Sequence, residues 1–166
     1  MRRVLILGLL VLGGCASAPK STMEKVGVRV AAEPAPACQS GHDSAISNGV
    51  ITIRPGETIC VTLEANGTSV APTRVVPSTT PQDTLVVKFW QEPGTNEMFL
   101  SVHNPLGNFL KYQAEILRPD SLQYEYTSSC PVMPRLLGIE NWPFPIAVLS
   151  LSNFKLLPDP KTAECN

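Results

Sequence analysis

Charged residues are scarce in this 166-residue sequence, at 16% against about 25% in typical soluble domains. Thirteen Lys and Arg are offset by 14 Asp and Glu, so there is no basic surplus to follow a phosphate backbone. No apolar run reaches the roughly 18 residues that a bilayer-spanning helix requires. We therefore expect neither a nucleic-acid partner nor a membrane-spanning helix, and the length suits a single domain.

Patterns that bind cofactors or perform catalysis are also missing. The histidines are His42 and His103, and neither accompanies a Gly-x-Ser-x-Gly nucleophile elbow. The glycines form neither Gly-x-Gly-x-x-Gly nor Gly-x4-Gly-Lys, so no nucleotide is indicated. Most carboxylates fall on polar strand faces or in turns, which disfavours a catalytic pair. The sequence predicts a protein that is not an enzyme and has no metal or other cofactor apart from a covalent lipid, introduced below.

Proline is abundant, at 16 of 166 residues, about twice its usual share of roughly 5%. Between the turns, apolar and polar residues alternate with a period of two, which is typical of antiparallel strands. We expect eight strands, over residues 26–31, 51–54, 59–66, 84–92, 98–102, 110–116, 122–126 and 146–157. The predicted fold is all-β, an antiparallel immunoglobulin-like β-sandwich of about seven or eight strands, with a closed barrel as the alternative.

Three turns suggest how these strands pair. The turn at 55–58 predicts a hairpin between the second and third strands. The turns at 93–96 and 104–108 predict a three-stranded meander over residues 84–116, with one apolar and one polar face. The Asn66-Gly67 pair is also typical of a turn.

The N-terminus has the three parts of a secretory signal peptide: a basic start, a short apolar run and a pair of small residues. Cys15 follows at once, so the junction reads Leu12-Gly13-Gly14-Cys15. This junction resembles the lipobox of bacterial lipoproteins. The alternative is an ordinary signal peptide with a chance cysteine near its cleavage site.

The resemblance implies that residues 1–14 are removed and that Cys15 becomes the lipidated first residue. Several acyl chains give stable membrane attachment. Residues 15–25 then form a short tether, and residues 26–166 form the single sandwich domain. Ala16, where Asp would favour the inner membrane, implies an outer-membrane lipoprotein that faces the periplasm rather than an inner-membrane or cell-surface one.

Four cysteines remain after lipidation, namely Cys38, Cys60, Cys130 and Cys165. In an exported chain this even number indicates two disulfides, for which three connectivities are possible. We favour Cys38–Cys60 and Cys130–Cys165, because each pair ties a long irregular stretch to a neighbouring strand. A zinc site is disfavoured because no two of these cysteines have Cys-x2–4-Cys spacing.

The most distinctive segment is residues 131–145, which combines four prolines with six large apolar residues. The prolines keep it out of a central strand. It either folds back as a lid on the core or forms a contact surface centred on Arg135, Trp142 and Phe144.

These features predict a non-enzymatic, lipid-anchored envelope protein that acts through contacts with a protein partner. One alternative is a carbohydrate- or small-ligand-binding module that uses Trp90, Trp142 and the tyrosines as stacking platforms. Another is an inhibitor that presents residues 131–145 to an envelope hydrolase.

Overall fold

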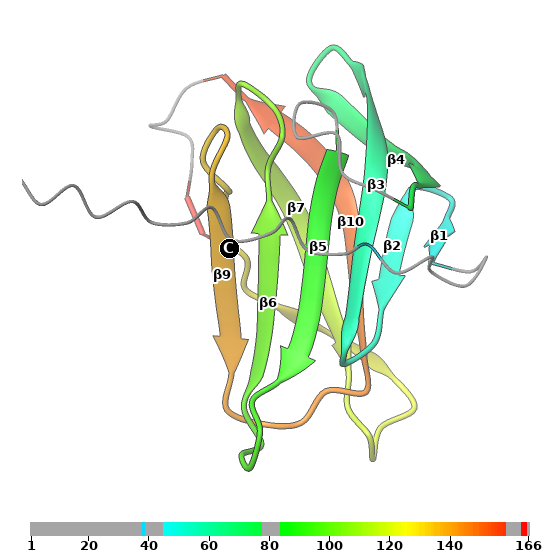
Figure 1. The fold of residues 1–166 in the computed structure, drawn as a ribbon, viewed down its shortest axis with the longest axis vertical. Helices are drawn as coiled ribbons and strands as arrows, with labels where there is room; N and C mark the ends of the chain where they lie inside the picture. The colour runs from blue at the N-terminus through cyan, green and yellow to red at the C-terminus, as the bar shows by residue number, and fades with distance from the viewer. Residues whose placement is uncertain (1–37, 39–44, 78–83, 159–163, 166) are drawn as a thin grey trace, which may run out of the picture. The chain divides into compact units, whose positions relative to one another are not determined.

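A computed structural model describes residues 38, 45–77, 84–158 and 164–165 (Figure 1). Among the described residues no helix is long and apolar enough to cross a bilayer. The predicted signal peptide, tether and first strand, and His42, lie outside these residues. The strands are β1 (Ile46–Ser47), β2 (Val50–Ile53), β3 (Glu57–Asn66), β4 (Ser69–Val75), β5 (Thr84–Gln91), β6 (Met98–His103), β7 (Phe109–Leu117), β8 (Tyr124–Thr127), β9 (Leu137–Trp142) and β10 (Val148–Leu157).

The strands form two antiparallel layers. One layer has the order β4-β3-β5-β6-β9, and the other has the order β1-β2-β10-β7-β8. Figure 1 shows β3, β5, β6 and β9 side by side in front of β7 and β10. The predicted all-β antiparallel sandwich is therefore confirmed, and the described residues alone contain ten strands, against the seven or eight predicted.

Strand β10 joins the two layers. Its first half pairs with β2, and its second half reaches β4 through Lys155 opposite Ser69. A register shift between Ser152 and Lys155 separates the halves, and Asn153 adopts a positive φ of 52° there. Such a bulge bends a strand, which allows one hydrogen-bonded sheet to fold over on itself.

The core lies between the layers and follows the period-two pattern. Each fully buried aliphatic side chain contributes roughly 1.5–3 kcal/mol relative to an exposed one. The largest fully buried side chains are Tyr112, Phe89, Ile51, Ile53, Ile59, Leu85, Met98, Leu100, Leu110, Ile146, Leu149 and Leu151.

Two predicted strand pairings are wrong. Strands β2 and β3 do not form a hairpin, because β2 pairs with β1 and β10 whereas β3 pairs with β4 and β5. Similarly, β7 does not continue the meander, because β6 pairs with β5 and β9. In both cases the short turn carries the chain from one layer to the other, so the strands it joins face each other across the core.

Strands β1, β4 and β9 were not predicted. The Asn66-Gly67 turn is confirmed, and it leads directly into β4 with Asn66 opposite Ser69. Pro72 obscured this strand in the sequence. The strand accommodates Pro72 because β4 pairs with β10 only at Ser69, so the N–H that proline lacks removes no hydrogen bond on the side of β4 that faces β10.

Both predicted disulfides are present, linking Cys38 to Cys60 and Cys130 to Cys165. Cys60 alternates with the core residues Ile59 and Val61 along β3, and its side chain is itself fully buried. The first bond attaches Cys38 to β3, which lies between β4 and β5. The second ties the end of the chain to the segment that leads into β9.

Candidate functional site

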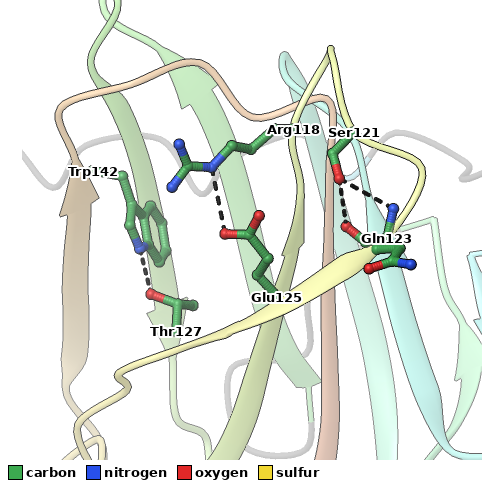
Figure 2. A network of polar contacts seen from close by, with 6 residues as sticks. All are labelled: Arg118, Ser121, Gln123, Glu125, Thr127 and Trp142. Carbon is green, nitrogen blue, oxygen red and sulfur yellow. Dashed lines mark hydrogen bonds and ion pairs between the residues drawn. The ribbon is translucent and has the colours of Figure 1, made fainter.

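Residues 127–132 close the side of the sandwich between β7 and β9. The Trp142 indole N–H donates to Thr127 Oγ1 at 2.7 Å, as Figure 2 shows. The Cys130 N–H donates to Glu140 Oε1 at 3.0 Å. Val132 forms a bridge with Leu110 of β7 through two backbone hydrogen bonds. The inner side of residues 127–132 thus covers the core. Of the predicted lid, residues 131–145, Val132 and Trp142 are buried, whereas four large apolar residues are exposed, namely Met133, Leu136, Leu137 and Ile139.

Trp142 belongs to the core and is only 6% exposed. Its ring meets Phe89 edge to face, with centroids 6.4 Å apart. It is therefore neither the centre of a contact surface nor a stacking platform for a ligand. Its burial follows from its inward position at the end of β9.

The other two predicted contact residues differ in exposure. Phe144 packs half-buried against the core, with the Arg118 guanidinium 4.3 Å above its ring. Arg118 also lies 3.5 Å from Glu125 Oε2, the ion pair drawn in Figure 2. Arg135 is exposed in the turn before β9, where its φ is 59° and its N–H donates to Leu106 O. The structure therefore does not bring Arg135, Trp142 and Phe144 together on one exposed surface.

The exposed apolar residues of this segment lie beside the predicted ones. Along β9, Gly138, Glu140 and Trp142 point inward, whereas Leu137 and Ile139 point outward and are 54% and 62% exposed. Met133 and Leu136, just before the strand, are also about half exposed. We call Met133, Leu136, Leu137 and Ile139 the β9 surface. Strand alternation within residues 137–142 was the sequence signal that could have identified it.

Aromatic residues lie next to the β9 surface on the same sheet face. Ile139 is opposite Ser101 of β6, and Phe99 lies two residues further along β6. Phe99 stacks on Trp90 with centroids 5.5 Å apart, and Lys88 Nζ lies 4.9 Å from the Trp90 ring. Diagonal neighbours across strands are within reach of aromatic side chains. The apolar area thus extends from β9 towards β5.

Asn104 fixes the base of the β9 surface and is fully buried. Its side-chain amide donates to the carbonyl oxygens of Asn108, Val132 and Met133 at 2.8–3.2 Å. Its Oδ1 accepts the Leu106 N–H at 2.9 Å. One polar side chain therefore joins the turn after β6 to the segment that enters β9. His103, immediately before it, is half-buried opposite Leu137.

A buried polar cluster lies beneath β9. Glu140 Oε1 accepts from the Tyr112 hydroxyl at 3.0 Å as well as from Cys130 N–H, whereas Oε2 is buried without a hydrogen-bond partner among the described residues. Burial raises the pKa of the Glu140 carboxyl, although these hydrogen bonds and the Lys111 charge oppose the shift. Burial also raises the Tyr112 pKa and lowers that of Lys111, whose Nζ donates to Ser129 O at 2.6 Å. Glu140 in this cluster can hold a proton. Its hydrogen bond with the Cys130 N–H also attaches residues 127–132 to β9.

Within the described ranges, no three His, Cys, Asp or Glu side chains are grouped so that they could hold a metal ion. No protein-family model matches the chain, and neither a curated protein nor a solved structure shows significant similarity to it.

Proposed function

We propose that this chain is a lipid-anchored envelope protein that binds a protein partner on the β9 surface and catalyses no reaction. The observation that carries the proposal is the exposure of Met133, Leu136, Leu137 and Ile139 on and just before strand β9. Apolar patches of this kind mark interaction sites. Asn104 and the Cys130–Cys165 bond hold the surface rigid, so little ordering entropy opposes binding.

The anchor in this proposal is the lipid on Cys15, which follows the lipobox-like junction. Ala16 favours the outer membrane and a periplasm-facing domain. Attachment to a surface raises the effective concentration of the domain for a partner in the same membrane. A modest apolar contact then suffices for stable association.

Two measurements test these parts separately. Metabolic labelling with an alkyne fatty acid should mark the wild-type chain and not Cys15→Ala, which should appear in the soluble periplasmic fraction. An unlabelled wild-type chain would contradict the anchor.

The contact is tested by capturing the chain from cross-linked envelopes. Ile139→Asp should lose a stoichiometric partner, because a buried unpaired carboxylate is costly at an interface. Leu122→Asp is the matched control, since Leu122 is fully exposed and lies outside the β9 surface. Equal recovery of the same partner with both variants would contradict the assignment.

A further inference from the structure

A second surface lies on the other layer, at the outer face of β7 and β8. Tyr124 and Tyr126 share one face of β8, and Tyr126 is 75% exposed. Residues two apart in a strand are about 7 Å apart, so the two phenol rings extend along one line. The opposite face of β8 carries Glu125 and Thr127, which bond to Arg118 and Trp142 (Figure 2).

Local contacts hold β8 so that its tyrosines remain outward. Ser121 Oγ donates to Gln123 O at 3.0 Å and accepts the Gln123 N–H at 3.1 Å, which fixes the turn before the strand (Figure 2). Four residue pairs then join β8 to β7, with Tyr126 opposite Glu115. Tyr126 is therefore exposed on a strand that is paired with β7 along its length.

A hollow of about 370 Å³ opens beside Tyr126, lined by Gln113, Ala114, Tyr126 and Thr127. It forms where the β7–β8 pairing ends, at Ala114 opposite Thr127. Gln113 is held in place there because its Oε1 accepts from the Asn153 side-chain amide. The Gln113 amide N–H groups and the Asn153 Oδ1 have no hydrogen-bond partner among the described residues.

The groups around this hollow define the chemistry that fits it. Across the face from Tyr126 lie Glu115 of β7, the buried Ser150 of β10 and Thr52 of β2, in register. This row contains hydroxyl and carboxylate groups but no Lys or Arg. Lys111 shares this face of β7, two residues from Gln113, but its Nζ already donates to Ser129 O and Glu164 O. The row therefore offers no free cation to a phosphate or another anionic polymer. An uncharged molecule with many hydroxyl groups finds both donors and acceptors here.

We propose that the outer face of β7 and β8 binds a neutral saccharide. The C–H face of a pyranose ring packs on the phenol ring of Tyr126, which offers an apolar body with a polar tip. Gln113 and Glu115 then bond to the sugar hydroxyls, and Tyr124 lengthens the surface for a neighbouring sugar. This site is independent of the β9 surface, because it uses different residues on the other layer.

The test is isothermal titration of the full mature chain in a detergent without a sugar head group. The probes are the hexamers of N-acetylglucosamine and of glucose, which are neutral, and polygalacturonate, which is anionic. At least one neutral hexamer should bind and polygalacturonate should not. Binding of neither neutral hexamer, or stronger binding of the anionic polymer, would overturn the proposal.

Variants locate the site. Tyr126→Ala should weaken binding about tenfold, equivalent to about 1.4 kcal/mol. Tyr126→Phe keeps the ring and should bind within about twofold of the wild type, or about 0.4 kcal/mol. Leu122→Ala changes an exposed neighbour outside the hollow and is the control. These positions are exposed, so the variants should unfold at the wild-type temperature. Undiminished binding by Tyr126→Ala would place the saccharide elsewhere and refute the inference.

Discussion

Replacing Asn104 by Ala removes four hydrogen bonds at the base of the β9 surface. Two of the released carbonyl groups keep a backbone partner: Val132 O still accepts from Leu110 N–H, and Met133 O from Leu136 N–H. The greater losses are at Asn108 O and at the Leu106 N–H. With about 0.5–1.5 kcal/mol for each of the four hydrogen bonds, we expect the free energy of unfolding to fall by about 2–6 kcal/mol.

The assay is urea denaturation followed by tryptophan fluorescence. Asn108→Ala is the matched control, because Asn108 is exposed and contributes its backbone carbonyl to Asn104. The control should change stability by no more than about 0.5 kcal/mol. If Asn104→Ala cost less than about 1 kcal/mol, a range in which single hydrogen bonds fall, Asn104 would not be the fixed point of this region.

Three further changes test the surrounding structure. Because the pKa of Glu140 is raised in the folded state, the stability that its protonated form provides is present below the ordinary value of 4.5 and is lost as pH rises through the folded-state pKa. Glu140→Gln should remove this loss, as measured by unfolding curves across this pH window. A pH profile unchanged by the substitution would contradict the expectation. Replacing Cys130 and Cys165 together by Ala removes the disulfide between residues 35 apart in the sequence. The free energy of unfolding should fall by about 3–4 kcal/mol in the chain-entropy model. Equal melting temperatures for this variant and the wild type would contradict the expectation. Gly138→Ala places a Cβ 2.8 Å from Val132 Cγ2. The free energy of unfolding, measured by the same urea denaturation, should fall by about 1–3 kcal/mol. An unchanged value would mean that Val132 can move aside.

The sequence correctly predicted the class of fold, because alternation along a strand is a local signal. The disulfide pairing that was favoured among three possible ones, between cysteines consecutive in the chain after Cys15, is also confirmed. Alternation along residues 59–66 and 110–116 reports which face of a strand is apolar. It does not report which strand lies alongside. A short turn can either close a hairpin or carry the chain to the opposite layer, and the turn at 55–58 does the latter. This choice depends on packing between strands distant in sequence.

The predicted contact residues were chosen by residue type, and that criterion selected Trp142 because Trp is common in binding sites. A large ring is just as suitable for filling a core, and position within the strand decides between the two. The side chain of Trp142 points inward from β9, whereas that of Ile139 points outward. Prolines on both sides of residues 137–142 argue against a strand, so the alternation within these residues did not by itself indicate one.

The proposed contact between the β9 surface and an envelope protein can be tested by replacing Ile139 with a photoreactive amino acid and irradiating intact cells. We expect one discrete protein adduct from position 139. It should be absent when the same photoreactive residue occupies position 122, because Leu122 is even more exposed but lies outside the β9 surface. No adduct at position 139, or the same adducts from both positions, would contradict it.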